Sequence, residues 1–197
     1  MKNSQHKQDQ KKKNKQNRLK KMSQFLCLVL RHKPEILKLF IDSNGYTRVD
    51  MLLLNLNKSQ HHDGLTLDEL KEIVHNDDKK RYSLVGEDDY IRCNQGHSLP
   101  YVDIMFERYT PSKDMYHGTS PDLEAVIMRD GLTPQSRNYV HLSTDLETAR
   151  TVGKRHSKKD APIIFKINKD APLTFYITDN GVINVKSVPP EYLMVLE

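Results

Sequence analysis

Hydrophobic residues near the start of the chain recur with helical periodicity only after about residue 21. Apolar positions at i, i+3, i+4, i+7 and i+8 lie on one face of a helix. Here they are Met22, Phe25, Leu26, Val29 and Leu30. The preceding residues 1–20 are rich in Lys, Gln and Asn and contain almost no apolar side chain. We expect that segment to be a disordered basic tail, because it cannot bury enough surface to offset the ordering of its backbone.

Two more helices and a hairpin are predicted in the first half of the chain. Residues 49–56 suit a short helix, and a Thr-x-x-Glu capping box opens another helix over residues 66–75. Residues 81–85 and 90–93 alternate as strands around a polar turn, which is typical of a hairpin. Three helices followed by a hairpin favour a winged-helix-like lobe over residues 21–98.

The second half mixes short strands with helices. A connector at residues 99–110 precedes a second lobe at residues 111–197. Capping signals at Ser120 and Thr144 open two helices that end at glycines. Strands are predicted at residues 115–117, 139–142, 162–167, 173–177, 182–186 and 192–196. Runs of strands after helices favour an α+β fold over a doubly wound sheet.

The positive charge of the chain is concentrated in its first residues. The net charge is +5, but residues 1–21 carry +8 and the remaining residues carry −3. The tail is therefore either a solvated segment, an RNA-affinity arm or a nuclear-localisation signal. If the rest of the chain binds nucleic acid, it must use a local patch.

The cysteines and the absence of an apolar leader indicate an intracellular protein. Cys27 and Cys93 both lie in apolar runs, so we interpret them as reduced, buried thiols and not as a disulfide framework. The lysine-rich start predicts no signal peptide and no membrane contact. We expect the protein in the cytoplasm or the nucleus.

Several kinds of chemistry lack their motifs. The 8 glycines never fall two positions apart, so no G-x-G-x-x-G dinucleotide fingerprint exists. No phosphate-binding P-loop, H-E-x-x-H, C-x-x-C or G-x-S-x-G motif is present. We expect no metal site.

The remaining polar motifs combine arginines, histidines and glycine turns. They are Arg31-His32, Arg81, residues 95–98, residues 116–119 and residues 137–143. Each has an ordinary structural explanation, such as a cation at the C-terminal end of a helix or a histidine satisfied within the core. Together they suit a ligand that carries several phosphates, because arginine binds phosphate oxygens bidentately.

Taken in order, these motifs resemble the NAD-dependent RNA 2′-phosphotransferases, the tRNA 2′-phosphotransferase family. The resemblance covers about residues 22–196, and only the His-Gly-Thr motif is shared more widely with ADP-ribosyltransferases. It implies an N-terminal winged-helix-like RNA lobe and a C-terminal ADP-ribosyltransferase-like lobe that binds NAD. Departures are Cys93, where the family often has alanine, and Tyr139, where it often has histidine.

The resemblance also implies the roles of particular residues. The catalytic set falls on Arg31, His32, Arg81 and Arg137. The expected NAD-binding residues are His117, Gly118, Thr119, Asn138, His141 and Ser143. Gln95, His97 and Ser98 are expected where the lobes meet, in contact with NAD or the phosphate.

The implied reaction moves an internal 2′-phosphate of RNA, from a tRNA splice junction, to NAD as co-substrate. Its products are RNA with a 2′-hydroxyl, nicotinamide and ADP-ribose 1″,2″-cyclic phosphate. No metal is needed, and we expect a monomer.

Two other functions fit part of the pattern. A mono-ADP-ribosyltransferase would use a late glutamate, but Glu191 follows two prolines and Glu197 is the last residue. A non-enzymatic winged-helix RNA-binding regulator would explain the first lobe and the tail. Such a regulator would not explain the presence of residues 117–119 and Arg137.

Overall fold

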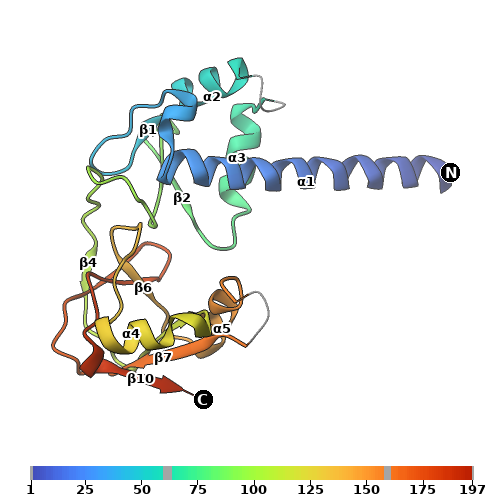
Figure 1. The fold of residues 1–197 in the computed structure, drawn as a ribbon. Helices are drawn as coiled ribbons and strands as arrows, with labels where there is room; N and C mark the ends of the chain where they lie inside the picture. Colours follow the sequence, from blue (N-terminus) through green and yellow to red (C-terminus); the bar gives the residue numbers. More distant parts are fainter. Residues whose placement is uncertain (1, 60–63, 158–160, 197) are drawn as a thin grey trace. The chain divides into compact units, whose positions relative to one another are not determined.

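The computed structural model describes residues 2–59, 64–157 and 161–196. The chain divides into two compact units, Met1–Ile104 and Met105–Glu197, which are described separately here. The division falls inside the segment predicted as a connector. Both units combine helices with small antiparallel sheets, which confirms a mixed α/β architecture (Figure 1).

The first unit contains helices in its first three quarters and ends in a hairpin. Its helices are α1 (Lys2–Arg31), the 3-10 helix η1 (Pro34–Leu37), α2 (Val49–Lys58) and α3 (Leu67–His75). Its strands are β1 (Thr47–Arg48), β2 (Tyr82–Val85) and β3 (Tyr90–Cys93), in the sheet order β1-β3-β2. The predicted hairpin is confirmed, since Tyr82 pairs with Cys93 and Val85 with Tyr90.

The core of this unit forms where the apolar stripe of α1 meets the other elements. Leu26, Val29 and Leu30 on α1 are fully buried, as are Leu52 and Ile91 on α2 and β3. Burial of each such side chain contributes about 1.5–3 kcal/mol, which fixes the C-terminal half of α1 against the sheet.

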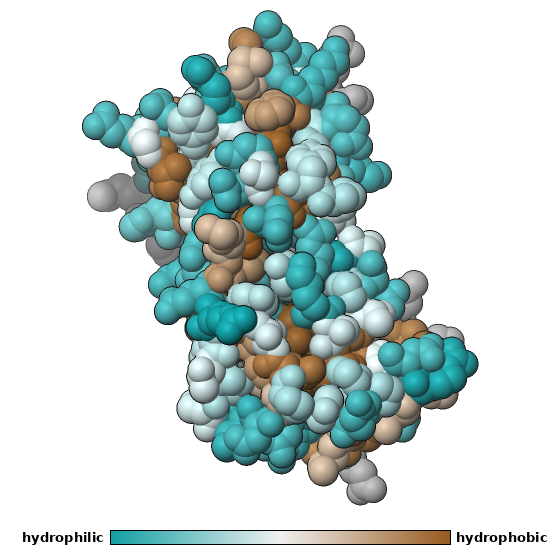
Figure 2. Space-filling view, turned by 90° about the vertical axis from the view of Figure 1, so that its left-hand side faces the viewer, coloured by the Kyte–Doolittle hydropathy of each residue, from teal (hydrophilic) through white to brown (hydrophobic). Residues whose placement is uncertain are grey.

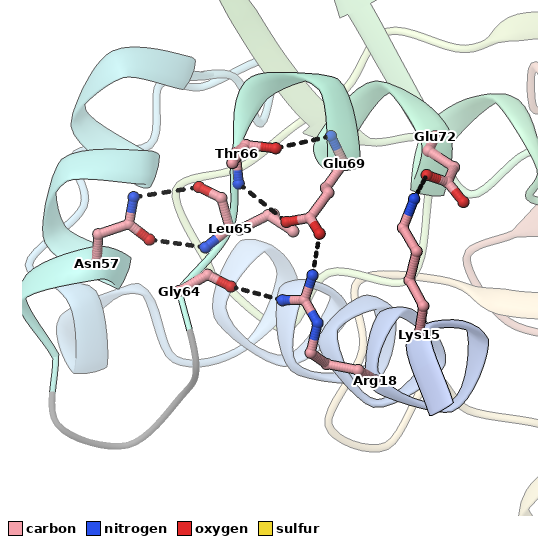
Figure 3. Close-up of polar contacts among 8 residues, drawn as sticks. All are labelled: Lys15, Arg18, Asn57, Gly64, Leu65, Thr66, Glu69 and Glu72. Atoms are coloured by element: carbon pink, nitrogen blue, oxygen red, sulfur yellow. Dashed lines mark hydrogen bonds and ion pairs between the residues drawn. The ribbon is translucent and has the colours of Figure 1, made fainter. Parts of the chain in front are cut away.

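Helix α1 begins at Lys2, which differs from the disorder predicted for residues 1–20. Two side chains attach its middle to the α3 region (Figure 3). Lys15 Nζ lies 2.7 Å from Glu72 Oε2, and Arg18 is ion-paired with Glu69 while it donates to the Gly64 carbonyl at 3.0 Å. Leu19 is also buried, so part of the tail does pack. The prediction missed these tertiary contacts and the good helix propensity of Lys and Gln.

The predicted capping box at the start of α3 is confirmed. The Thr66 hydroxyl accepts from Glu69 N at 3.2 Å, and the Glu69 carboxylate accepts from Thr66 N at 3.2 Å (Figure 3). Asn57 fixes Leu65, the residue before Thr66. The Asn57 side-chain amide donates to the Leu65 carbonyl and accepts from Leu65 N. The start of α3 is thereby fixed by local bonds.

The second unit contains two small antiparallel sheets. One has the order β10-β7-β5, built from β10 (Leu193–Leu196), β7 (Ile163–Ile167) and β5 (Met115–Thr119). The other has the order β4-β8-β9-β6, built from β4 (Glu107–Tyr109), β8 (Phe175–Ile177), β9 (Ile183–Val185) and β6 (Val140–Leu142). The helices are η2 (Pro121–Leu123), α4 (Glu124–Asp130), α5 (Leu146–Gly153) and η3 (Pro190–Tyr192).

Both sheets of the second unit contribute to one core. Met115, Phe165 and Ile167 come from the first sheet, and Phe175 and Ile183 come from the second. Hydrogen bonds between Tyr116 and Ser143 also link β5 to the residue after β6.

Two local predictions in this unit need correction. The side chain that caps α5 belongs to Asp145 and not to Thr144, because an Asp145 carboxylate oxygen accepts from Thr148 N at 2.6 Å. The helix predicted after Ser120 begins as the 3-10 turn η2, and no side-chain hydrogen bond caps it at Ser120.

Hydrophilic residues cover most of the face shown in Figure 2, with hydrophobic residues visible between them. Within the described part of the chain, no helix has both the length and the apolar character that a membrane span requires.

Candidate active site

In the first unit, the end of α1 is bonded to the loop after β3. Ser98 N donates to the Arg31 carbonyl at 3.0 Å, and the Ser98 hydroxyl lies 2.9 Å from His32 Nδ1. These bonds place Arg31 and His32 directly beside residues 95–98.

The Arg31 guanidinium lies against Gly96. A Cβ built on Gly96 would be 3.6 Å from Cζ, Nε and Nη1 of Arg31, and Gly96 has a φ of +88°. The left-handed conformation favours glycine here, whereas a spacing of 3.6 Å is ordinary van der Waals contact. Arg31 Nε and Nη2 are buried and have no hydrogen-bond partner. A buried cation with unused donors is costly unless it binds an anion, so these nitrogens indicate a ligand contact.

His97 is buried beside the same arginine. Burial, together with the positive charges of Arg31 and His32, lowers the pKa of His97 to about 3. The imidazole is therefore neutral, and its Nε2 is buried without a partner. Gln95 Oε1 is also buried without a partner. These two groups add neutral polar atoms next to the cation.

Arg81 is held by an acidic residue that the sequence analysis did not single out. Asp77 is ion-paired with the Arg81 guanidinium and accepts from Arg81 N at 2.5 Å. The Asp77 side chain is only 5% exposed. Asn94 N donates to the Arg81 carbonyl at 2.8 Å, so Arg81 adjoins the segment that leads to residues 95–98. Residues 77–81 lie in the turn after α3 and not on a helix, so their i, i+4 spacing gives no signal of this pair in the sequence.

In the second unit, His117 and His141 are linked through the backbone. His117 Nδ1 donates to the His141 carbonyl at 3.0 Å, which leaves Nε2 as the acceptor of a neutral ring. Burial lowers the pKa of His117, and the hydrogen bond to the His141 carbonyl offsets part of this decrease. Arg137 Nη1 donates to His141 Nδ1 at 2.8 Å. The predicted residues Arg137, His117 and His141 therefore lie together in this unit.

The motifs at residues 116–119 and 137–143 are adjacent because β5 and Ser143 share backbone bonds. Tyr116 N donates to the Ser143 carbonyl at 2.7 Å, and Ser143 N donates to the Tyr116 carbonyl at 2.9 Å. The Ser143 hydroxyl donates to the Asp145 carbonyl at 2.9 Å. Thr119 is 6% exposed, and Asn138 follows Arg137 at the start of the second motif.

Gly118 has a packing role that the sequence analysis did not foresee. A Cβ on Gly118 would lie 2.0 Å from the Ala149 carbonyl oxygen of α5. Gly153 faces the same place, since its Cβ would lie 2.9 Å from Thr119 N. The two glycines let α5 approach β5, so the Cβ side of Gly118 faces a helix.

One face of the sheet β4-β8-β9-β6 carries His141 together with three polar residues that the sequence analysis left unassigned. The pairings place Arg108, Tyr176, Asn184 and His141 opposite one another in a row across the sheet. Asn184 is 1% exposed, and its Oδ1 has no hydrogen-bond partner. The alternation of Ile183, Asn184 and Val185 puts Asn184 on the opposite face of the strand, but it does not indicate that this face is buried.

Tyr139 borders this polar face. Its ring makes edge-to-face contacts with Phe106 and Tyr176, and Lys186 Nζ lies 3.9 Å from its centroid. Aromatic rings and a buried amide beside His141 suit the sugar or base of a nucleotide. Among the residues that the structure describes, no group of three or more His, Cys, Asp or Glu side chains is arranged to hold a metal ion.

Each unit thus brings its own part of the predicted set together. The first contains Arg31, His32, Arg81, Gln95, His97 and Ser98, and the second contains His117, Gly118, Thr119, Arg137, Asn138, His141 and Ser143. In the first unit, the buried donors of Arg31 beside neutral His97 have the character of a site for a phosphorylated ligand.

Comparison with known proteins gives this class a narrower definition. The model of the family described as "RNA 2'-phosphotransferase, Tpt1 / KptA family" matches residues 17–187. A protein from Trichormus variabilis is 42% identical over 185 residues, covering 92% of this chain and 98% of its own length. A protein from Hahella chejuensis is 40% identical over 185 residues, covering 91% and 96%. Both are named "Probable RNA 2'-phosphotransferase".

The chain belongs to the RNA 2′-phosphotransferase family, and it is a transferase.

Proposed function

We propose that this enzyme transfers an internal 2′-phosphate of RNA to NAD. The observation that carries the proposal is the buried Arg31 guanidinium, whose Nε and Nη2 have no partner within the protein. His32 adjoins it through Ser98, and Arg81 lies nearby in the same unit. Family membership supports the 2′-phosphate of RNA as the anion that these donors bind.

Arg31 and Arg81 have different properties that suit different tasks. Arg31 is fixed by burial against Gly96 and offers its fork to phosphate oxygens. Arg81 remains paired with Asp77, so its charge is already partly balanced and its orientation is fixed. We infer that Arg31 binds the phosphate directly, that Arg81 adds positive charge to the same phosphate, and that His32 assists proton transfer.

The second unit has groups that fit NAD. Neutral His117 presents Nε2 as an acceptor, and Asn184 Oδ1 is a buried acceptor without a partner, which suits ribose hydroxyl donors. Asn138, His141, Ser143 and the backbone near Gly118 and Thr119 complete the proposed NAD site. NAD supplies an electrophilic anomeric carbon, C1″ of its nicotinamide ribose.

The proposed chemistry balances in two displacements. An oxygen of the RNA 2′-phosphate bonds to C1″, and nicotinamide leaves with the electrons of the broken C–N bond. The ribose 2″-oxygen then bonds to phosphorus as its proton is lost, and the RNA 2′-oxygen leaves and takes up a proton. We propose that Arg31, Arg81 and Arg137 stabilise the negative charge of the second step, as arginines do in phosphoryl transfer.

The finer features expected from the sequence remain part of this proposal. The helix and hairpin order of the first unit supports a winged-helix-like RNA lobe, and the paired small sheets of the second support an ADP-ribosyltransferase-like lobe. We propose tRNA with a splice-junction 2′-phosphate as the substrate and a monomer as the working form. Because tRNA is an intracellular molecule, the enzyme would act in the cytoplasm or the nucleus.

A short RNA with one internal 2′-phosphate tests this function directly. With NAD, the full-length protein should remove the phosphate and release one nicotinamide per RNA. Without NAD, the RNA should stay unchanged. Phosphate removal without NAD would contradict the proposal, and so would label from NAD that stays attached to protein or RNA. The latter result would favour a mono-ADP-ribosyltransferase, and binding without turnover would favour a non-enzymatic RNA-binding regulator.

The role of Arg137 has a matched control within the same unit. Arg137→Ala should lower turnover by roughly 10²–10³-fold if the guanidinium contacts developing negative charge. Arg129→Ala removes an exposed arginine that pairs only with neighbouring Asp130 in the bonds described, and it should leave turnover within about twofold. A loss below tenfold for Arg137→Ala would remove Arg137 from the catalytic set.

A further inference from the structure

Both cysteines of this chain, Cys27 and Cys93, lie near the candidate phosphate-binding Arg31, whose positive charge acts on each thiol. Cys27 lies on α1 one helical turn before Arg31, and its Sγ is 3.0 Å from the hydroxyl of Tyr82. Tyr82 is the direct cross-strand partner of Cys93 on β3, so their side chains share one face of the hairpin. Helix α1 packs on β3, and both thiols are free.

The two thiols differ in accessibility and in acidity. Cys27 is half-buried, whereas Cys93 is fully buried. The nearby Cys93 thiol, opposed by burial and supported by the charge of Arg31, lowers the pKa of Cys27 to about 6. Burial raises the pKa of Cys93. An accessible thiolate next to a buried thiol resembles the attacking and resolving cysteines of thiol–disulfide exchange.

We propose that Cys27 and Cys93 are a reversible redox pair whose disulfide lowers the activity of the enzyme. This proposal rests on the function proposed above. The oxidant is a small-molecule disulfide of the glutathione type, and the resting state is the reduced one seen in the structure. Disulfides are rare in reducing compartments, and those that form there are usually transient.

The reaction proceeds by two exchanges that balance. The Cys27 thiolate attacks one sulfur of the oxidant, which forms a mixed disulfide and releases one thiolate. The Cys93 sulfur then attacks Cys27 Sγ, gives up its proton to the released thiolate and expels the second thiolate. Two protein thiols are oxidised to one disulfide, and one small-molecule disulfide is reduced to two thiols.

The disulfide would disturb the site through geometry. An S–S bond is about 2.05 Å long, which is shorter than any contact between two thiols. Forming it draws the last turn of α1 towards the end of β3. Arg31 follows Cys27 on that turn, and Gly96 and Ser98 follow Cys93 in the loop that contacts Arg31. A displacement of about 1 Å in a catalytic group can cost on the order of 10²-fold in rate.

The test incubates the full-length protein in glutathione buffers that range from reduced to oxidised, followed by acid quenching. Intact mass should show the loss of two hydrogens, and peptide mapping should find Cys27 linked to Cys93. Activity on 2′-phosphorylated RNA with NAD should fall by about tenfold or more in parallel and return with a thiol reductant. Cys27→Ser and Cys93→Ala should keep their activity in oxidised buffer.

The mass readout separates this proposal from the proposed function. A protein that forms the bridge but never turns over RNA and NAD would overturn the function and leave the pair intact. Absence of the bridge in the native protein would overturn the pair, as would a stable glutathione adduct on Cys27 alone. A complete bridge with unchanged activity would overturn the regulatory role.

Discussion

His97 is a buried, neutral imidazole, and keeping it neutral lowers the free energy of unfolding at acidic pH. Its pKa is about 3 in the folded protein, against an ordinary value of 6.5, chiefly because of burial. The unfolded chain therefore binds a proton that the folded chain excludes, and the stabilising contribution present above pH 6.5 is lost as the pH falls towards 3. The slope from this residue is about 1.4 kcal/mol per pH unit at most.

We predict that His97→Gln flattens the pH dependence of stability. Between about pH 6 and 4, its free energy of unfolding should fall less steeply than that of the parent protein, by about 1 kcal/mol per pH unit. Urea titrations monitored by circular dichroism measure this difference. His75→Gln, which replaces an exposed histidine at the end of α3, is the matched control. Parallel pH profiles for the parent and His97→Gln would show that His97 is not held neutral.

Gly118 provides a second prediction from the contact of β5 with α5. In Gly118→Ala the new Cβ would lie 2.0 Å from the Ala149 carbonyl oxygen, so one backbone must move. We expect a loss of roughly 2–3 kcal/mol in the stability of the second unit, as for overpacking elsewhere. Gly181→Ala is the control, because Gly181 has a φ of +77° but nothing within 4 Å, and it should cost about 1 kcal/mol. Equal losses would mean that the approach of α5 to β5 is not tight.

Among the elements, α1 combines a packed half with an exposed basic half. Residues 8–17 are exposed, and beyond the Lys15 contact the helix extends past α3 (Figure 1). Lysines four positions apart on such a helix repel one another, which phosphate groups would relieve. We predict that deleting residues 1–13 leaves turnover at saturating RNA unchanged but reduces the slope of log affinity against log salt by about 2–4.

Substitutions that keep the helix propensity of α1 test separately whether its charge causes the salt dependence of RNA binding. Replacing Lys11, Lys12 and Lys13 by glutamine removes charge while it keeps residues that favour a helix. The salt slope should fall by a similar amount per lysine removed. If the slope is unchanged in both variants, the N-terminal half of α1 does not contact RNA.

Local signals determined how well each element could be predicted. The capping box of α3 and the hairpin of β2 and β3 depend on residues close together in the sequence. Both were therefore predicted correctly. Strands β1 and β4 were missed, because two or three residues carry no periodicity and form strands only against β3 and β8. The extent of α1 was missed because Lys15 and Arg18 gain their partners from α3, far away in the sequence.

The candidate site shows the same limit. The resemblance to a family singled out Arg31, His97 and Arg137, because each of these residues by itself has an ordinary structural explanation. Asp77 and Asn184 were missed because their importance depends on neighbours in space, Arg81 in one case and a row of paired strands in the other. No composition or spacing distinguishes such an asparagine from a solvent-exposed one.

At the scale of the whole molecule, the proposed ligands would stabilise different units. A ligand that binds only the folded state raises stability by about 2.7 kcal/mol at a hundredfold excess over its Kd. We predict that NAD slows amide hydrogen exchange in β5 and β6 of the second unit. RNA with a 2′-phosphate should slow exchange around residues 94–98 of the first unit. The RNA effect should disappear in Arg31→Ala, whose missing guanidinium is the proposed phosphate contact, and persist in Arg129→Ala.

The two ligands together should also protect more than the sum of each alone, because the proposed reaction requires one phosphate to reach both sets of residues. A non-reactive NAD analogue keeps both ligands intact during the exchange measurement. Coupling between the sites is reciprocal, so the analogue should tighten RNA binding by the same factor as RNA tightens binding of the analogue. Arg137→Ala should reduce that factor if Arg137 acts on the phosphate that Arg31 binds. Strictly independent binding of the two ligands, with each protecting its own unit alone, would contradict a shared phosphate and leave the two clusters as separate sites.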